Sequence, residues 1–472
     1  MRTLVLMKGA PGAGKSTFIR NQGLEPYTLS PDTIRNMYAG PVLGLDGRLQ
    51  TSHEQESKVW QTLMELLEER MSRGEFTVID ATHSRTDMIT RYRKLCKDYR
   101  YRAIVVDFTD VPLEVCQQQN LQRPDYKQVP YDRLENIYAR FEGQQVQGWV
   151  KVVKPHELEE ALVHEPRDFS HYRKIHHIGD IHGSVTVLRQ YFEQNPVSED
   201  ELYIFTGDYI DRGTKNKETL DYLLDLSVYE EDGQEKTHRN FIFLEGNHER
   251  HLWRWANNEE SVSKVFETQT RPQLEAGLDE EALADYKKRI RQFYRRLYQI
   301  LPYNYTTTEG LQRVLVTHGG YSAFPEQFMR YSTDSFINGI GNYEDDIDLA
   351  FTKNTTENEW QIHGHRNIYR LPTQAADRSF NLEGRIEYGG DLRVVQLTKE
   401  GFEVVELQNP DFNVKDIGKK VYRAPQSIEE MLENMSDHRM VRETKVTDSI
   451  SSFNFTNQAF QKKKWDEMTV RA

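Results

Sequence analysis

The first third of the chain alternates short apolar runs with longer stretches of helical periodicity. Residues 4–7 form an apolar run that leads into a Gly-rich loop, and residues 77–79 and 103–108 form two further β-rich runs. Between them, apolar side chains recur at helical spacing at Val59, Leu63, Leu66, Leu67 and Met71. Strands that alternate with helices favour a parallel sheet, so we predict an α/β domain over residues 1–154.

A second series of short apolar strands begins at residue 174, after a polar stretch over residues 155–173 that is typical of a linker. The strands lie in KIHHIGD, ELYIFTGD, NFIFLEGNH, RVLVTHGG and EWQIHGH, and each carries a histidine or a carboxylate at its end. The charged residues 258–300 are typical of a helical insertion. We therefore predict a second α/β domain over residues 174–408, followed by a tail of different composition over residues 409–472.

Composition limits the class of protein. The chain has 472 residues, 37% of them hydrophobic, and no apolar run approaches about 18 residues, so we expect no membrane span. The N-terminal apolar run leads directly into the Gly-rich loop, where a signal peptide would need a cleavage site. Only Cys96 and Cys116 are cysteines, which excludes a disulfide framework and fits a reducing, cytoplasmic location. The net charge of −13 argues against broad coating of nucleic acid but leaves local basic grooves open.

Residues 9–16 read GAPGAGKS, which fits the P-loop pattern between an apolar strand and a helix. In such a loop the backbone N–H groups wrap phosphates, the lysine reaches the β- and γ-phosphates, and the serine hydroxyl binds magnesium. A carboxylate commonly sits beside that magnesium, and Asp80 ends the run TVID. The sequence thus predicts a site for ATP, or another NTP, with Mg²⁺, formed by Gly9, Gly12, Ala13, Gly14, Lys15, Ser16, Thr17 and Asp80.

Three further residues bear on the phosphate acceptor. Asp32 could accept the proton of an attacking hydroxyl, and Arg35 could hold a phosphate of the acceptor. The same segment, SPDTIR, also reads as a helix start with Ser30 or Asp32 as its cap, and both interpretations can hold together. Arg123 follows a strand and a helix, where it is either a lid arginine on the transferring phosphate or a surface arginine.

The second domain carries the pattern of a two-metal phosphoesterase. Two divalent ions close together need a bridging carboxylate, oxygen and imidazole ligands, and room for a water molecule that acts as the nucleophile. Asp208 is the natural bridge, with two ligands to one ion and three to the other. The predicted ligands are Asp180 and His182 for the first ion, Asp208 for both, and Asn247, His318 and His365 for the second.

The residues around these ligands predict the remaining chemistry. Arg212 would hold the phosphate oxygens, His248 would protonate the leaving group, and Asp211 would orient His248. Imidazole ligands favour a transition metal such as Mn²⁺. Other polar residues nearby are interpreted as neighbours or loop carboxylates, namely His363, Glu383 and Asp391.

The motifs of the first domain, GAPGAGKS, SPDTIR, VIDATH and QNLQRP, resemble the 5′-hydroxyl polynucleotide kinases of the P-loop class over residues 1–154. The resemblance implies Asp32 as general base, Arg35 on the 3′-phosphate of the acceptor and Arg123 on the donor phosphates. The second set, GDIHG, GDYIDRG, GNHE, THGG and HGHR, resembles the calcineurin-like metallophosphoesterases over about residues 174–400. HGHR lacks the GHxH histidine of many relatives, so one metal is expected to have fewer protein ligands.

The tail contains DHRMVRETKV, SSFNFTNQAF and KKKWDEMTVRA, which resemble the start of a nucleotidyltransferase-type RNA ligase domain. In that family a similar stretch leads into a lysine that attacks ATP, and Arg471 stands near its place. The other interpretation is a basic, aromatic-bearing tail that packs on the second domain. We do not predict ligation by this chain alone.

The order of kinase, phosphatase and ligase-like fragment resembles the bacterial polynucleotide kinase-phosphatase-ligases of RNA repair. It implies phosphorylation of 5′-hydroxyl ends and removal of 3′-phosphate or 2′,3′-cyclic phosphate from RNA or DNA, with a separate ligase as partner and a homodimer as an open alternative to a monomer. A rival is a small-molecule kinase fused to a protein phosphatase or dinucleotide polyphosphate hydrolase. A non-catalytic scaffold is the second rival, and intact Lys15, Asp208, Asn247 and His248 argue against it.

Overall fold

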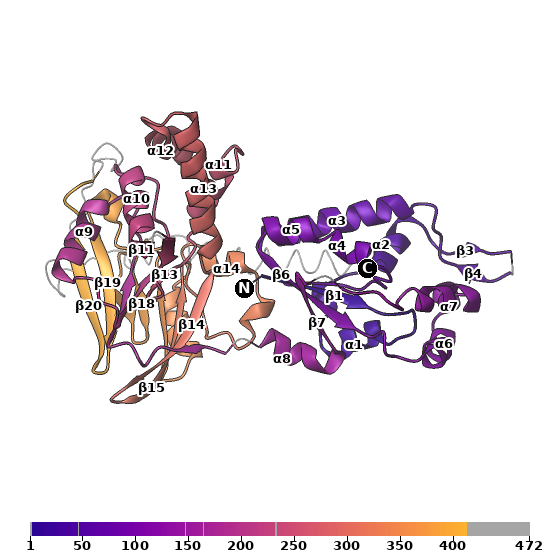
Figure 1. The fold of residues 1–472 in the computed structure, drawn as a ribbon. Coiled ribbons are helices and arrows are strands. Elements are labelled where there is room, and N and C mark those ends of the chain that lie inside the picture. Colours follow the sequence, from indigo (N-terminus) through magenta and orange to yellow (C-terminus); the bar gives the residue numbers. More distant parts are fainter. Residues whose placement is uncertain (1, 46, 147, 164, 232–233, 413–472) are drawn as a thin grey trace, which may run out of the picture.

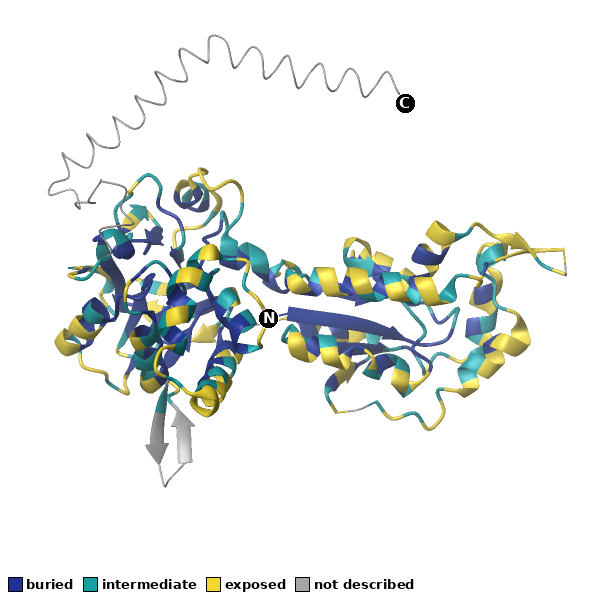
Figure 2. Cartoon of the chain, turned by 90° about the horizontal axis from the view of Figure 1, so that it is seen from above, coloured by how far each residue is buried: buried dark blue, intermediate teal, exposed yellow. Residues whose placement is uncertain are grey.

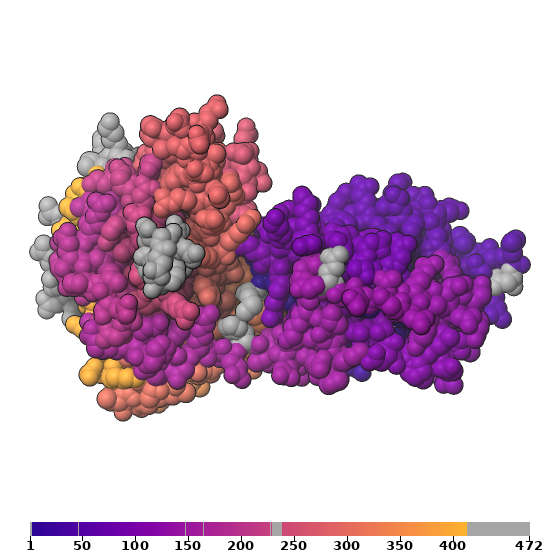
Figure 3. Space-filling model, in the orientation of Figure 1, coloured from indigo at the N-terminus to yellow at the C-terminus, as the bar shows by residue number. Residues whose placement is uncertain are grey.

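The computed structural model describes residues 2–412 except 46, 147, 164 and 232–233. Two domains lie side by side as two lobes, the first over the N-terminal third of the chain and the second over the rest of the described residues (Figures 1 and 3). Almost all of the ligase-like tail, Arg471 included, lies outside the described residues. Within the described part, no helix is both long and apolar enough to cross a membrane.

The first domain is built on a five-stranded, fully parallel sheet. β1 lies at its centre and is buried along its whole length, as the dark blue strand beside the N label in Figure 2 shows. In sheet order the strands are β2 (Thr28–Leu29), β5 (Thr77–Ile79), β1 (Arg2–Lys8), β6 (Tyr101–Asp107) and β7 (Val150–Val153). A strand buried on both faces needs a continuous apolar run, which residues 4–7 provide.

Helices cover both faces of this sheet because alternate residues of β1 point to opposite sides. Val5 and Met7 pack with α1 (Lys15–Asn21), α6 (Leu113–Leu121), α7 (Tyr131–Ala139) and α8 (Leu158–Leu162). Leu4 and Leu6 pack with α2 (Pro31–Tyr38), α3 (Glu56–Ser72), α4 (Thr86–Thr90) and α5 (Arg93–Asp98). A two-stranded hairpin, β3 (Val42–Leu43) and β4 (Leu49–Gln50), extends from the far end.

The stretch expected to be a linker, residues 155–173, is structured over part of its length. A 3₁₀ turn, η3 (Pro155–Glu157), leads into α8, whose Leu158, Ala161 and Leu162 are buried in the core of the first domain. Further on, β8 (Arg167–Asp168) pairs with a strand of the second domain. The apolar side chains of α8 lie among charged residues in the sequence, which hides the helix from a reading of composition alone.

Two sheets pack face to face in the second domain. The first contains β13 (Phe241–Phe243), β10 (Glu201–Phe205), β9 (Lys174–Ile178), β19 (Asp391–Thr398) and β20 (Gly401–Gln408). The second contains β17 (Gln374–Ala376), β18 (Ser379–Asn381), β16 (Glu359–His363), β15 (Gly310–Thr317), β14 (Ile300–Thr307) and β8. Their shared core contains Ile175, Ile204 and Val395 from one sheet and Val314 and Phe380 from the other.

Helices complete the sandwich on both outer faces. α9 (Val185–Gln194), α10 (Asn216–Ser227), α11 (Glu249–Ala256) and α13 (Glu280–Arg296) bury apolar residues against the first sheet. α14 (Thr333–Asn338) and α15 (Ile347–Asn354) cover the second. The predicted helical insertion contains a π-helix, η4 (Phe266–Thr270), then α12 (Arg271–Glu275) and α13. β11 (Val228–Glu231) and β12 (Gln234–Thr237) pair as a separate two-stranded antiparallel sheet.

Polar contacts join the two domains. Arg2 Nε donates to Thr333 Oγ1 at 2.9 Å, and the backbone N–H of Thr333 donates to the carbonyl of Gly74 at 3.1 Å. Arg100 donates to the carbonyl of Tyr294 at 2.8 Å and forms an ion pair with Glu245. Burial opposes ionisation of Glu245, but the neighbouring arginines outweigh it and lower the pKa of this carboxyl to about 2.

Arg100→Ala is expected to lower the free energy of unfolding of the chain by about 3–5 kcal/mol, because it leaves the buried Glu245 carboxylate without its cation. Urea denaturation measures the loss, and Arg93→Ala, at an exposed site on α5, is the matched control. Adding Glu245→Gln to Arg100→Ala removes the unpaired charge and should recover part of the stability. Equal stability of the single and double variants would contradict this account.

Candidate active sites

The predicted nucleotide site lies at the carboxyl end of β1, where the chain turns into α1. Ser16 Oγ donates to Asp80 Oδ2 at 2.7 Å, so the two candidate magnesium ligands meet although 64 residues separate them. Gly12 has φ +83°, and a side chain there would meet the carbonyl oxygen of Cys116 at 2.1 Å, so this position needs glycine. Ala13 is buried, whereas Ser16 and Thr17 are exposed on the first turn of α1.

The ammonium group of Lys15 is buried inside the loop. It donates to the carbonyls of Gly9 and Ala10, at 2.8 Å each. Burial lowers the pKa of Lys15 to about 8, although Asp80 and Asp32 oppose the shift. A cation held out of water in a ring of backbone groups is suited to bind an anion that enters the loop.

Asp32 and Arg123 come together beside this lysine. The Arg123 guanidinium lies 3.8 Å from an Asp32 carboxylate oxygen, and Asp32 keeps 52% of its side chain exposed. The Arg35 guanidinium donates to both carboxylate oxygens of Glu56 at 2.9 Å and to Asp32 at 2.6 Å. Arg35 therefore positions Asp32 in this structure, and its contact with an acceptor phosphate stays a prediction.

Five strands of the second domain deliver the predicted metal ligands to one place. Asp180 and His182 follow β9, Asp208 follows β10, and Asn247 follows β13. His318 follows β15, and His365 follows β16. The ends of neighbouring strands meet at one edge of each sheet, so residues far apart in sequence converge.

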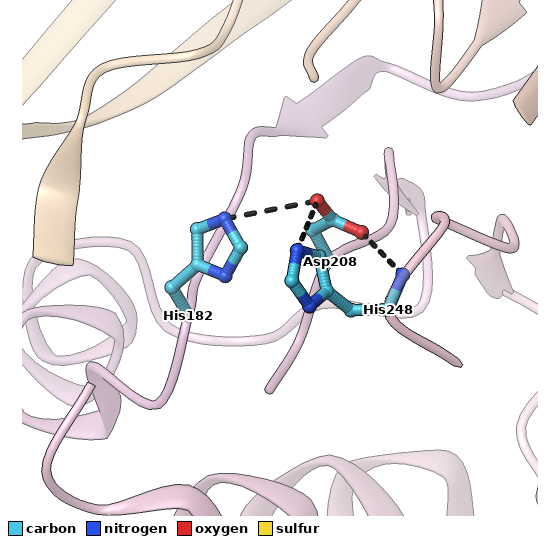
Figure 4. A group of neighbouring side chains, drawn as sticks. All are labelled: His182, Asp208 and His248. Carbon is cyan, nitrogen blue, oxygen red and sulfur yellow. Dashed lines mark hydrogen bonds and ion pairs between the residues drawn. The ribbon is translucent and has the colours of Figure 1, made fainter. Parts of the chain in front are cut away.

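The carboxylate of Asp208 lies close to several imidazoles, and Figure 4 shows it with those of His182 and His248. One of its oxygens lies 3.7 Å from His182 Nε2, 3.9 Å from His248 Nε2 and 3.2 Å from His318 Nε2. Asn247 Oδ1 lies 3.2 Å from His318 Nε2 and 2.9 Å from His365 Nδ1. Burial opposes ionisation of Asp208, yet the imidazoles hold its pKa well below its usual value.

The donor set fits two divalent cations. Three groups have all their donor atoms within 4.8 Å of one another, namely His182 with Asp208 and His248, Asp208 with His318 and His365, and Asp180 with His182 and Glu383. Asp180 Oδ1 and His248 Nε2 are buried and have no hydrogen-bond partner among the described residues. Burial, together with the charges of Glu383 and Asp208, raises the pKa of Asp180 well above its usual value, and cations would relieve that repulsion.

Two predicted catalytic residues flank this cluster. His248 Nδ1 lies 2.6 Å from Asp211 Oδ2, and Thr270 of the π-helix donates its hydroxyl to the other oxygen of Asp211. Burial alone would lower the pKa of His248, but the carboxylates of Asp208 and Asp211 raise it above its usual value. A protonated imidazole at this position can act as a general acid.

Arg212 also reaches the cluster. Its Nη1 lies 3.4 Å from His182 Nε2 and 3.0 Å from Glu387 Oε1, and 38% of its side chain stays exposed. Burial opposes its charge, yet Glu387 and Asp208 raise the pKa of its guanidinium, which therefore stays cationic. An exposed guanidinium beside the cluster is suited to hold phosphate oxygens.

Strained backbone marks the same place. Positive φ angles occur at His182, Asp208, Asp211, Arg212 and His365, between +42° and +73°. Such conformations cost free energy in residues other than glycine and persist where the surrounding structure imposes them, as at binding sites. A side chain at Gly364 would meet Asp180 Oδ1 at 1.9 Å, so this glycine permits the close approach of the His365 loop.

Comparison with known protein families agrees with both halves of the structure. Residues 4–144 match the AAA domain model, and residues 173–405 match the model of calcineurin-like phosphoesterases. The chain joins a P-loop domain to a calcineurin-like phosphoesterase domain. The predicted fold class is therefore confirmed, and phosphoesterases of this class use divalent metals.

Individual relatives are distant. The serine/threonine-protein phosphatase PP1-delta of Caenorhabditis elegans is 30% identical over 148 residues, which is 30% of this chain and 38% of that protein. The chain thus spans well under half the length of this curated relative. Among solved structures, a candidate diadenosine tetraphosphatase is 16% identical over 50% of this chain and 94% of its own, with a TM-score of 0.35. A serine/threonine phosphatase from Saccharomyces cerevisiae is 14% identical over 52% and 82%, with a TM-score of 0.33.

Two acidic residues of the calcineurin-like domain have a closer relation to the site than the sequence suggested. Glu383, interpreted as a loop carboxylate, lies with Asp180 and His182 in one group of potential ligands. Glu249 is buried and accepts the backbone N–H groups of Asp208, Tyr209 and Gly246 at 2.8–2.9 Å. The GNHE string contained Glu249, but nothing in the sequence shows that it holds another motif in place.

The other polar neighbours have structural partners. His363 Nε2 lies 2.9 Å from Asp348 Oδ1, and His363 is in none of the three groups of potential ligands among the described residues. Asp391 begins β19, where burial and the charge of Glu406 raise the pKa of its carboxyl. Asn367 stands where a GHxH motif would place its second histidine, and its amide instead donates to the carbonyls of Leu371 and Glu383.

Glu249→Ala is expected to lower phosphoesterase activity and metal affinity by about 10–100-fold, because three buried N–H groups that fix the Asp208 loop lose their acceptor. Calorimetric titration with Mn²⁺ measures the affinity. Glu260→Ala, in the exposed segment after α11, is the matched control. Unchanged metal affinity in a folded Glu249→Ala protein would show that Glu249 does not position the ligands.

Proposed function

We propose that the chain heals broken nucleic-acid ends, as an ATP-dependent 5′-hydroxyl polynucleotide kinase and a metal-dependent 3′-phosphatase and 2′,3′-cyclic phosphodiesterase. The observation that carries the proposal is the half-exposed carboxylate of Asp32 beside Arg123 and Lys15. A P-loop that only hydrolyses ATP needs no second carboxylate for an acceptor hydroxyl. The same chain contains a phosphoesterase domain, so it can both add and remove phosphate.

In the kinase reaction, the oxygen of the 5′-hydroxyl attacks the γ-phosphorus while Asp32 takes the proton of that hydroxyl, and ADP leaves. Arg35 and Glu56 hold Asp32 in orientation. Lys15 and Arg123 face the charge that develops on the transferring phosphoryl group. Mg²⁺, held by Ser16 and Asp80, would neutralise charge on the donor phosphates.

In the phosphoesterase reaction, the arrangement of Arg212, His248 and Asp211 assigns each a step. Arg212 binds the substrate phosphate and orients it for in-line attack. His248 gives its Nε2 proton to the departing sugar oxygen, and Asp211 fixes the imidazole in the tautomer that carries this proton. Two divalent metals, held by Asp208 and the ligands around it, would supply a nucleophile at neutral pH and neutralise phosphate charge.

The products would be a 5′-phosphate and a 3′-hydroxyl, which a separate ligase can join. The direct test is incubation of the chain with ATP and an oligonucleotide that bears 5′-hydroxyl and 3′-phosphate ends, with both ends followed by gel electrophoresis. RNA and DNA versions show which nucleic acid is preferred. Conversion of neither end, with small hydroxylated metabolites phosphorylated instead, would overturn the proposal.

A second candidate is a phosphoprotein phosphatase fused to a small-molecule kinase. The 30% identity to a serine/threonine-protein phosphatase over 148 residues favours it. A phosphoserine peptide and a 3′-phosphorylated oligonucleotide, compared at equal concentration, separate the two candidates. The end-healing proposal expects the larger kcat/KM for the oligonucleotide.

Removal of metal is expected to abolish phosphoesterase activity, and Mn²⁺ should restore it far better than Mg²⁺, because the imidazole ligands favour a transition metal. The kinase should run on Mg²⁺, which is bound mainly by phosphates and by Ser16 and Asp80. Exhaustive chelation followed by titration with each ion measures both activities. Equal phosphoesterase rates in Mg²⁺ alone would contradict the assignment of the histidines.

A further inference from the structure

A cavity of about 660 Å³ opens between the two domains. None of the described residues that line it belongs to either of the two predicted active sites. Its lining is strongly basic, and none of the described residues that line it is acidic. The chain as a whole has a net charge of −13, so this concentration of positive charge is local. The cavity contains His238 and six arginines, namely Arg2, Arg100, Arg167, Arg239, Arg295 and Arg296.

Both domains contribute to this basic cavity. Arg2 begins β1 and Arg100 precedes β6 in the P-loop domain, and the N label in Figure 1 marks this junction. Arg295 and Arg296 end α13 in the phosphoesterase domain. Because Arg100 donates to the carbonyls of Tyr294 and Leu297, the contact between the domains itself brings these arginines together.

The arginines differ in how exposed their side chains are. Arg2 and Arg100 are largely buried and hold the domains together through Thr333 and Glu245. Arg239, Arg295 and Arg296 are exposed side chains at the same cavity. The cavity therefore has a fixed basic wall and an exposed basic rim, which is the arrangement expected of a site for an extended anion.

The position of the cavity indicates which kind of anion it binds. Phe241 and Phe243 of β13 line it, and the chain continues from the end of this strand to Asn247 and His248 of the phosphoesterase site. Three residues separate Phe243 from Asn247, so the two lie at most roughly 13 Å apart along the chain. A ligand in the cavity thus lies beside the strand that immediately precedes the predicted metal ligand Asn247.

We propose that the basic cavity binds the phosphodiester backbone of a single-stranded polynucleotide, behind the end that is being processed. This inference rests on the proposed end-healing function and adds where the body of the substrate binds. Guanidinium groups bind phosphate oxygens through paired N–H donors, and the exposed side chains of Arg239, Arg295 and Arg296 can contact successive phosphates of one strand. A mononucleotide has one phosphate position and would engage only part of this lining.

The test compares two double variants on the same helix. Arg295→Gln with Arg296→Gln removes two charges from the rim of the cavity, and Lys288→Gln with Arg289→Gln removes two from exposed positions of α13 outside it. Fluorescence anisotropy measures the Kd of a labelled single strand of about 12 nucleotides over a range of salt concentrations. Arg239→Gln provides an independent variant from the segment before β13.

The rim variant is expected to weaken binding by about ten-fold or more and to reduce the slope of log K against log salt by about 1.4, as for two lost phosphate contacts. The Lys288 and Arg289 variant should bind like the unmodified chain. A nucleoside monophosphate should compete poorly; if it displaces the strand at equal concentration, the cavity is a nucleotide site and the proposal is wrong. Unchanged Kd and slope in both cavity variants would also overturn it.

The outcome is separable from that of the proposed function. If the unmodified chain processes oligonucleotide ends but the rim variant binds the strand normally, the cavity proposal fails and end healing stands. If the strand binds through the cavity but neither end is converted, the binding site stands and end healing fails. Thermal unfolding of each variant shows whether a loss of binding reflects a loss of folded protein.

Discussion

Lys15→Ala is expected to reduce phosphate transfer to a 5′-hydroxyl end by about 10³-fold or more, while phosphate release from the 3′ end stays within about two-fold. The buried ammonium of Lys15 is enclosed by the P-loop and faces the place where donor phosphates bind, so its removal takes charge stabilisation from the transferring group. The predicted metal ligands lie in a different domain with its own cores. Assays of both ends of one oligonucleotide measure the two rates in a single reaction.

Asp32→Ala should give the same selectivity by a different route. Its carboxylate is expected to act on the acceptor hydroxyl, so the substitution should lower kcat and leave the affinity for ATP nearly unchanged. Lys15→Ala should lower both the kcat of the kinase reaction and the affinity for ATP. Loss of both activities in a folded Lys15→Ala protein would contradict the model of two separate sites.

The parts of the fold and the sites that the sequence predicted are those encoded by short contiguous strings. GAPGAGKS predicted a loop between β1 and α1, and the structure brings its Ser16 to Asp80. The strings that end at Asp180, Asp208 and Asn247 predicted strands with ligands at their ends, because a strand followed by a polar residue and glycine is a local pattern. The gathering of these ligands followed from the expected sheet.

The remaining interactions depend on pairs that are distant in sequence. Glu56 lies 21 residues from Arg35 and Glu245 lies 145 residues from Arg100, so no local pattern links them. Glu383 reaches the ligand cluster from the loop after β18, and a carboxylate in a loop has no pattern that separates a ligand from a solvated side chain. Such roles emerge only when the tertiary structure sets two segments side by side.

The same reason explains the basic cavity. Its arginines come from β1, the start of β6, β8, the segment before β13 and the end of α13, and each alone reads as an ordinary surface or strand residue. The net charge of −13 suggested no such concentration, since net charge does not report where charges lie. The docking of two domains, rather than any motif, creates the site.

His248→Ala is expected to slow release of phosphate from a 3′-phosphorylated oligonucleotide by about 10²–10⁴-fold, and to slow hydrolysis of p-nitrophenyl phosphate far less. The sugar 3′-oxygen is a poor leaving group that needs a proton, whereas p-nitrophenolate leaves readily without one. His248 is placed to supply that proton, since Asp211 lies 2.6 Å from its Nδ1 and its Nε2 has no hydrogen-bond partner in the part of the chain that the structure describes. Steady-state kcat/KM for the two substrates gives the ratio.

Asp208→Ala provides the contrast, because it removes the central carboxylate between His182 and His318 and should abolish hydrolysis of both substrates. Asp211→Asn keeps the shape of the partner of His248 but removes its charge, so it should reproduce the selectivity of His248→Ala in weaker form. Equal slowing of the two substrates by His248→Ala would show that this histidine binds phosphate or supports the metal ligands. The proton would then have to come from another group.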